Sequence, residues 1–201
     1  MTLDPESLTT LAAVKAQLEI DPADTSQDEL LADMIQAATA AVETYCKRRF
    51  ARQENIAEAF PAHGARELYL RRPPVEAVAE VSLDGMLLPP EAYRVDEATG
   101  LVTIFQPPGA SQHSRYVVRY TGGFVTPAQA EASDGMLQRT LPRDVELAAL
   151  LVVTTLYRNR GRDANVTSES VLSARQAWGD SGWLVLSPAA QALLNPWRLY
   201  P

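Results

Sequence analysis

Apolar residues at helical spacing dominate the stretch from 141 to 161, LPRDVELAALLVVTTLYRNRG. Steps of four, three and four positions separate its main apolar series, which comprises Val145, Ala149, Val152 and Leu156. Leucines and valines fill most of the other positions, and a helix that is apolar nearly all round has to be buried on several sides. Pro142 suits a first helical turn, and Gly161 after a basic last turn suits a helix end. We therefore predict a long buried helix that is the central scaffold of the fold.

Two further helices are expected near the N-terminus. The first covers Leu11–Leu18, and an acidic D-P-A-D break follows it. Ser26 and Glu29 match the S-x-x-E capping box, in which each side chain bonds an amide of the first helical turn. The helix that starts there should extend to about Arg48. Its apolar positions step by four and three: Leu31, Ile35, Ala38, Val42 and Tyr45. Such a seam packs against another helix, so the two helices are predicted to form a helical hairpin.

Between residues 51 and 123 the pattern changes to short alternating runs that are typical of strands. The runs expected as strands span 67–70, 75–83, 93–95, 101–105 and 115–120. Asp84-Gly85 predicts a type I′ hairpin turn, because both central residues of that turn need positive φ. Thr99-Gly100 predicts a second turn, so the region should form a small, mostly antiparallel sheet. Residues 124–140 are expected to form a polar loop, and residues 188–194 a short helix.

Together, these elements predict an α+β fold. The N-terminal helical hairpin and the long buried C-terminal helix should form a helical bundle that carries an inserted small antiparallel β-sheet and an extended C-terminal tail. The predicted boundaries place the hairpin at 1–50, the β block at 51–123, the loop and long helix at 124–161, and the tail at 162–201.

The formal net charge of −7 is unevenly distributed along the chain. Residues 1–46 contain nine acidic residues and one basic residue, whereas residues 47–72 contain seven basic and three acidic residues. An acidic protein is a poor candidate for free nucleic-acid binding, which depends on neutralising phosphates. It can still tolerate DNA that passes nearby without holding it.

Basic residues gather at the expected C-terminal ends of the two long helices. These clusters are Lys47, Arg48 and Arg49 in one helix and Arg158 and Arg160 in the other. Positive charge at a helix C-terminus interacts favourably with the helix dipole, which is one explanation. The alternative is a patch that contacts phosphate or an acidic partner surface. The patch between Lys47 and Arg52 also supports a second candidate function, a small DNA-binding or regulatory module, although the sequence lacks a helix-turn-helix pattern.

No catalytic or metal-binding constellation has convincing spacing. The chain has two histidines and one cysteine, Cys46, so neither a zinc site nor a Cys–His nucleophile is expected. Gly122-Gly123 lies outside any phosphate-binding glycine motif. We therefore expect no enzymatic activity, no cofactor and no metal. The longest apolar run, 147–153, is too short to cross a membrane, and the acidic N-terminus does not resemble a signal peptide, so synthesis in the cytoplasm is expected.

All three tryptophans fall within the last 24 residues, which have little periodicity. Trp, Tyr and Arg are the residue types enriched at interface hot spots. The candidate partner-binding residues of this tail are Trp183, Trp197, Arg198, Leu199 and Tyr200. They either dock onto a partner protein or pack back onto the chain's own domain.

The order of six segments along the chain resembles that of a known family, although no single motif is diagnostic. The segments are LTTLAAVKAQLEI, DELLADMIQAATAAVETYCKRRF, LYLRRPPVEAVAEVSLDG, YRVDEATGLVTI, VVRYTGGF and LPRDVELAALLVVTTLYRNRG. Together they resemble the head–tail connector proteins, the adaptors or head-completion proteins of tailed bacteriophages and gene transfer agents. The resemblance covers about residues 8–161, and the closing LLNPWR is similar to adaptor C-termini.

The resemblance implies a structural virion protein without enzymatic activity. Members of the family assemble as a dodecameric ring beneath the portal protein, extend the DNA channel and present a surface to the downstream stopper or tail-completion protein. Genome DNA passes through the channel without sequence-specific binding. The C-terminal segments of the family commonly reach onto the portal, which would explain an aromatic tail. The expected location is the head–tail interface of the virion, after synthesis in the host cytoplasm.

A ring built from one repeated head-to-tail contact needs two different complementary faces on each subunit. The acidic segment 1–46 and the basic segments 47–72 and 158–162 are candidates for these faces. The residues expected in an inter-subunit basic patch are Lys47, Arg48, Arg49, Arg158 and Arg160.

Overall fold

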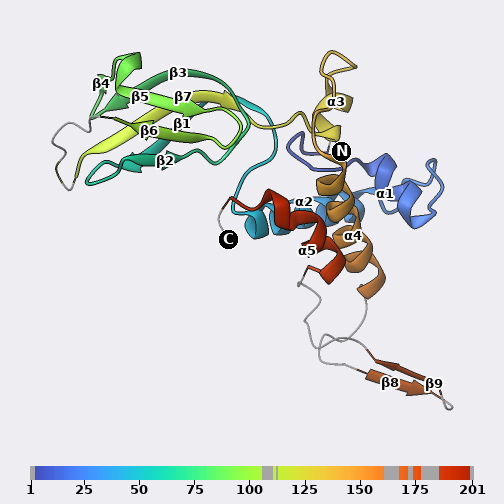
Figure 1. The fold of residues 1–201 in the computed structure, drawn as a ribbon. Helices are drawn as coiled ribbons and strands as arrows, with labels where there is room; N and C mark the ends of the chain where they lie inside the picture. Colours follow the sequence, from blue (N-terminus) through green and yellow to red (C-terminus); the bar gives the residue numbers. More distant parts are fainter. Residues whose placement is uncertain are drawn as a thin grey trace.

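Four α-helices pack together, and a block of antiparallel strands stands beside them (Figure 1). The computed structural model describes residues 3–105, 111, 113–160, 168–171, 174–177 and 186–199. The four packed helices are α1 (Leu11–Leu18), α2 (Asp28–Cys46), α4 (Arg143–Asn159) and α5 (Pro188–Leu194). The chain therefore has an α+β fold, as predicted, and the short helix at 188–194 is confirmed.

Helix α4 contacts each of the other three packed helices. Its buried side chains are small or β-branched: Val145, Ala148, Ala149, Val153 and Thr154. Each buried valine contributes about 1.5–3 kcal/mol before the cost of ordering it. Leu147, however, is 44% exposed, because the neighbouring helices leave that side of α4 uncovered. Helix α4 is therefore buried on several sides, as predicted, while one side stays open to solvent. Pro142 precedes the helix as its N-cap, and Gly161 lies outside the described residues.

The predicted capping box at Ser26 does not form. Helix α2 begins at Asp28, and its N-cap residue, Gln27, makes no side-chain capping bond. The Ser26 amide instead donates to Oδ1 of Asp24 at 2.9 Å, and Asp28 forms an ion pair with Lys15 of α1 at 2.6 Å. The turn between α1 and α2 is thus held by the Asp24 side chain and by the ion pair between the two helices. These two contacts form in place of the capping box.

The β block contains two antiparallel sheets. The first has the order β1-β7-β3-β4 and comprises β1 (Gln53–Pro61), β3 (Val75–Leu83), β4 (Met86–Leu87) and β7 (Arg115–Gly122). The second has the order β2-β6-β5 and comprises β2 (Glu67–Tyr69), β5 (Tyr93–Asp96) and β6 (Leu101–Ile104). Both sheets contribute to one core, in which Tyr116 and Tyr120 are fully buried. The antiparallel pairing is as predicted, whereas the prediction of one sheet is wrong.

The turns within the β block follow the predicted chemistry. Asp84 and Gly85 have φ values of 49° and 84°, as a type I′ turn requires. A short 3₁₀ helix, η1 (Pro90–Ala92), leads into β5. Strand β1 was not predicted, because four of the nine residues in QENIAEAFP are polar and none of its side chains is fully buried.

The predicted loop at 124–140 contains a helix, α3 (Pro127–Ala132), which corrects that prediction. The Thr126 hydroxyl accepts from the Gln129 amide, and the Gln129 side chain accepts from the Thr126 amide, both at 3.1 Å. This reciprocal pair is a capping box that stabilises even a short helix. The sequence T-P-A-Q at 126–129 contains the Thr and Gln of this capping box, which could have predicted the helix.

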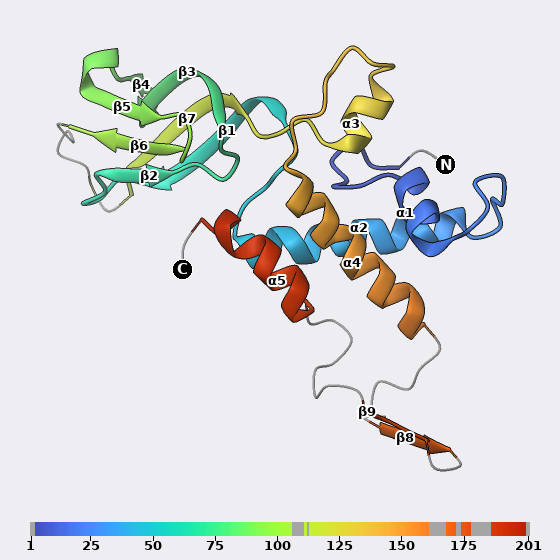
Figure 2. The ribbon, with the colours of Figure 1, turned by 45° about the vertical axis from the view of Figure 1, so that its right-hand side comes forward.

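Two short strands follow α4 in the chain, β8 (Ser168–Val171) and β9 (Ala174–Ala177). They pair with each other as a hairpin that lies away from the other elements in both views (Figure 1, Figure 2). A second 3₁₀ helix, η2 (Asn195–Trp197), ends the described chain after α5. Across the ranges that the structure describes, no helix has the length and apolar character needed to span a membrane.

Candidate interaction surfaces

Arg48 lies inside the junction between α2 and the β block. Arg48 is 8% exposed, and its guanidinium donates to the Pro73 carbonyl oxygen. The guanidinium carbon lies 4.8 Å from the ring centre of Phe50 and 5.6 Å from that of Phe124, so two aromatic faces stabilise the charge. Burial lowers the pKa of Arg48 to about 10. The structure thus places Arg48 in the interior of the junction, and its role in an inter-subunit patch stays a prediction.

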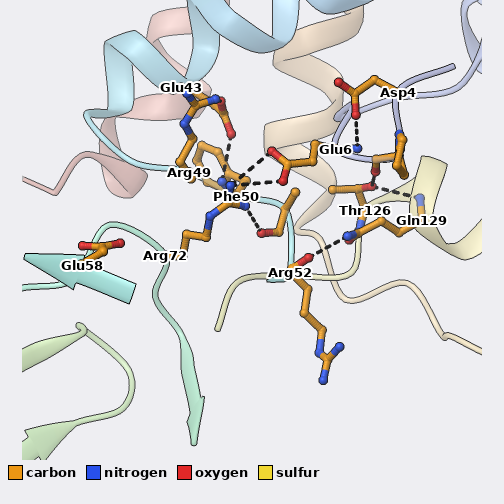
Figure 3. Close-up of polar contacts among 12 residues, drawn as sticks. Asp4, Glu6, Glu43, Arg49, Phe50, Arg52, Glu58, Arg72, Thr126 and Gln129 are labelled. Atoms are coloured by element: carbon orange, nitrogen blue, oxygen red, sulfur yellow. Dashed lines mark hydrogen bonds and ion pairs between the residues drawn. The ribbon is translucent and has the colours of Figure 1, made fainter. Parts of the chain in front are cut away.

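Arg72 is the second buried arginine of this junction (Figure 3). It donates to the Ala51 carbonyl oxygen at 2.6 Å and to both carboxylate oxygens of Glu6 at 3.2 Å. The N-terminal segment is also held from the other side, because the Thr126 hydroxyl donates to the Pro5 carbonyl oxygen at 2.9 Å. These bonds connect the N-terminal segment, the end of α2 and the β block.

Glu43 links the interior of the junction to its surface. One carboxylate oxygen accepts from the Phe50 amide at 3.1 Å, and the other accepts from the Arg49 guanidinium at 2.6 Å (Figure 3). The Glu43 side chain is 5% exposed, whereas that of Arg49 is 57% exposed. Burial raises the pKa of Glu43, although the Phe50 amide and the Arg49 charge act in the opposite direction. The pair therefore spans the boundary between core and solvent.

A shallow pocket of about 250 Å³ opens to solvent at the C-terminal end of α2. Its lining residues are Ala40, Glu43, Thr44, Lys47, Arg48, Arg49 and Arg71. Four of these are basic and one is acidic, and Lys47, Arg49 and Arg71 are exposed. A concave basic surface of this kind fits a carboxylate that approaches from outside.

The basic run between Lys47 and Arg52 is not a continuous phosphate-binding strip. Arg48 is buried and Arg49 is paired, as described above. Arg52 forms ion pairs with Glu54 and Glu76, each at 2.8 Å. These internal contacts neutralise most of the run, so the geometry does not favour a DNA-binding module.

The second basic cluster lies at the other end of the bundle. Arg158 and Arg160 are exposed, and the Arg160 guanidinium carbon lies 3.7 Å from the ring centre of Tyr157. The Tyr157 hydroxyl donates to Gln27, the N-cap residue of α2, at 2.9 Å. The end of α4 therefore lies beside the start of α2. The two basic clusters occupy opposite ends of α2 and do not form one patch on a single chain.

Trp197 packs against the chain's own helices. Its indole nitrogen donates to the Asp144 carboxylate at 2.7 Å, and its ring makes an edge-to-face contact with Phe124 at 5.9 Å between centroids. For this residue the structure shows the intramolecular packing that was one of the two alternatives. Trp183 and Tyr200 lie outside the described residues, and the partner-binding role of the tail stays a prediction.

Arg198 and Leu199 continue along the end of α2. The Arg198 guanidinium carbon lies 5.1 Å from the Tyr45 ring centre, and the Leu199 amide donates to the Cys46 carbonyl oxygen at 3.0 Å. That bond satisfies one of the last carbonyl groups of α2, which have no partner within the helix. Arg198 and Leu199 of the tail therefore pack against the C-terminal end of α2.

No signal in the sequence indicates the pair between buried Arg72 and half-buried Glu6. The two residues are 66 positions apart, and no periodic pattern distinguishes Arg72 from its exposed neighbour Arg71. Both arginines look like solvated charges that precede a pair of prolines. Only the fold shows that one is buried in the junction and the other lines the pocket.

No group of His, Cys, Asp and Glu side chains is placed to hold a metal ion in the part of the chain that the structure describes.

Solved structures of gene transfer agent particles contain chains whose fold is similar to that of this protein. The chain is similar to a component of the "Virion of native gene transfer agent (GTA) particle" with a TM-score of 0.63 and 18% identity, over 98% of this chain and 93% of that one. It is similar to a chain of the "Neck of empty GTA particle computed with C6 symmetry" with a TM-score of 0.58 and 19% identity, over 98% and 93%. For the "Neck of native GTA particle computed with C12 symmetry" the values are 0.54 and 18%, over 98% and 95%. These likenesses show a shared fold.

No curated protein matches the chain. The family model described as "Head completion protein" matches residues 7–198, which is nearly the whole chain. This match makes the protein a structural one and confirms that it is not an enzyme. The resemblance seen in the ordered sequence segments is also confirmed. The chain belongs to the head completion protein family.

Proposed function

We propose that this protein is a head–tail connector that forms a ring beneath the portal, extends the DNA channel and joins the capsid to the tail or stopper. The observation that supports it best is the combination of the family match with a shared fold over 98% of the chain. The neck particles that contain the similar chains were described with C6 and C12 symmetry, which is the symmetry of closed rings. The protein would act at the head–tail interface of the virion, after synthesis in the host cytoplasm.

The charge of the chain is compatible with a DNA channel that does not grip its cargo. The net charge is −7, and the buried or paired arginines leave few free cations on the surface of the junction. Phosphates are held by free Lys and Arg side chains, so genome DNA would pass without sequence-specific binding.

The C-terminal tail supplies a second part of the proposal, contact with the portal protein. The residues predicted for this contact are Trp183, Trp197, Arg198, Leu199 and Tyr200. Because Trp197 and Leu199 are anchored on the chain's own helices, they would hold the tail in a fixed position rather than detach to bind. Trp183 and Tyr200 are the residues of this set most directly tested by substitution.

Imaging tests the proposal. The purified protein is mixed with the portal protein of the same particle, and the complexes are examined by electron microscopy. A ring of this protein on one end of the portal is the expected result, and a portal that stays bare at saturating protein concentrations would overturn the proposal. Trp183→Ala with Tyr200→Ala should lower the fraction of portals that carry a ring. Truncation at residue 188 is unsuitable, because Ala190 and Leu194 of α5 are fully buried in the core.

A further inference from the structure

The two ends of α2 carry opposite charges. At the start of α2, the turn after α1 exposes the side chains of Glu19, Asp21 and Asp24. At the end of α2 lies the basic pocket described above. In both views the loop between α1 and α2 and the C-terminal end of α2 lie on opposite sides of the helical part (Figure 1, Figure 2). The 19 residues of α2 hold these ends about 28 Å apart.

The charges of the acidic turn have few internal partners. Asp21 and Asp24 each accept a backbone amide two residues ahead, at 2.9 Å, and these bonds hold the turn in shape. Among the described contacts, neither these aspartates nor Glu19 forms an ion pair, whereas Asp28 is paired with Lys15. The other cations that the structure describes at this end are Arg158 of α4 and the C-cap residue Arg160. Because none of the three exposed carboxylates forms an ion pair among the described contacts, each can bind a cation of an external partner.

One residue at each of these two ends has an unusual backbone conformation. Glu19 follows α1 and Lys47 follows α2, and both adopt the left-handed conformation, with φ of 58° and 55°. Glycine is the usual residue at this position, because a Cβ atom makes the conformation unfavourable. The other described non-glycine residues with positive φ are Asn or Asp, which tolerate it well. A charged side chain at these two sites destabilises the fold, which points to a role outside the folded chain.

We propose that the acidic turn of one copy inserts into the basic pocket of the next copy. Asp21 and Asp24 of the first copy would contact Lys47 and Arg71 of the second, beside the Arg49–Glu43 pair. The contact is head to tail, so its repetition around an axis gives a closed ring. The inference rests on the proposed ring function and names the surface that builds the ring.

A second copy is the occupant that fits both surfaces at once. The separation of about 28 Å exceeds the distance of ~8 Å over which charges interact in physiological salt, so the two ends cannot neutralise each other within one chain. A partner that matched only the pocket would leave the exposed acidic turn unexplained. Two copies of this chain explain both with a single repeated contact.

Charge reversal on each surface separately tests this arrangement. The pocket variant carries Lys47→Glu and Arg71→Glu, and the turn variant carries Asp21→Lys and Asp24→Lys. Each variant alone would place like charges at every contact. An equimolar mixture can form a ring in which the two variants alternate, and then every contact again joins opposite charges. The matched control is Arg94→Glu, an exposed residue of β5 outside both surfaces.

The readout is the number of rings on portal complexes, counted by electron microscopy, with the composition of each ring from native mass spectrometry. Each variant alone should lower ring formation at least about tenfold, as expected when like charges meet at an interface. The mixture should restore it, with equal numbers of the two variants, and the control should match the wild type. Rings formed normally by either variant alone, or a mixture that stays dissociated, would overturn the contact. Circular dichroism establishes that each variant is folded.

The outcome separates this inference from the proposed function. If each variant alone forms rings as often as the wild type does, the proposed function stands and the proposed contact is refuted. If the wild type forms no ring on the portal, the proposed function fails. Sedimentation of the concentrated chain at low and high ionic strength then decides the contact. Association that is lost in each variant and recovered in the mixture supports it, and a wild type that stays monomeric throughout refutes it.

Discussion

The junction at the end of α2 contains two layers of basic residues that differ in what they hold together. The inner layer consists of Arg48 and Arg72, both 8% exposed and bonded to backbone carbonyl groups. The outer layer consists of Lys47, Arg49 and Arg71, which are exposed around the pocket. The inner charges fix the β block on the helices. In the outer layer Arg49 is paired with Glu43, while Lys47 and Arg71 form no ion pair among the described contacts and can act on another molecule.

The comparison shows that neighbouring residues of one type can have unrelated roles. Lys47 and Arg48 are adjacent, as are Arg71 and Arg72, and in each pair one side chain is inside and the other outside. A buried guanidinium has lost its hydration, so its loss or reversal leaves unpaired groups in the core. An exposed cation is solvated with or without a partner, so its reversal costs little within the chain.

The largest expected effect is that of Arg48→Glu. The substitution would place a carboxylate beside the Pro73 carbonyl oxygen and the faces of Phe50 and Phe124, all of which repel negative charge. We expect the free energy of unfolding to fall by about 3–5 kcal/mol. Urea denaturation followed by circular dichroism measures it. Lys47→Glu is the matched variant in the outer layer and should shift the midpoint only slightly. Equal losses from the two variants would remove the distinction between the layers.

The sequence predicted the elements that depend on local patterns. The hairpin turn at Asp84 and the helices α2 and α4 followed from turn chemistry and periodicity. It did not predict how the charges at 47–49 divide between core and surface, because that depends on where Phe50, Phe124 and Pro73 meet in space. The capping box at Ser26 failed for a similar reason, since the ion pair between Asp28 and Lys15 fixes the start of α2.

The edge of the inner layer is tested by Trp197→Phe. The ring contact with Phe124, which also covers Arg48, would remain, whereas the hydrogen bond from the indole nitrogen to Asp144 would be lost. We expect a loss of about 1–2 kcal/mol in the free energy of unfolding. If the variant is as stable as the wild type but binds the portal more weakly, Trp197 contacts the partner rather than supporting the fold.

The outer layer is tested by Lys47→Gly, which should stabilise the fold. Glycine adopts the left-handed conformation of this position without the cost that a side chain incurs, so a gain of about 1 kcal/mol is expected. Differential scanning calorimetry measures the shift in Tm. The same variant should form fewer rings. A destabilised variant would show that Lys47 supports the fold, as the inner residues do.

The smallest effect concerns Glu43, which joins the two layers through Phe50 and Arg49. Burial raises the pKa of Glu43 above its ordinary value of 4.5, so the folded chain binds the proton more readily than the unfolded chain. Protonation therefore contributes stability that is fully present below about pH 4.5 and is lost as the pH rises through the raised pKa. Glu43→Gln removes this dependence while its side-chain oxygen can still accept from the Phe50 amide. The difference in unfolding free energy between wild type and variant should therefore move in favour of the wild type on acidification from neutral pH. A difference that stays constant, or moves the other way, would mean that the outer partner Arg49 rather than burial determines the behaviour of this carboxylate.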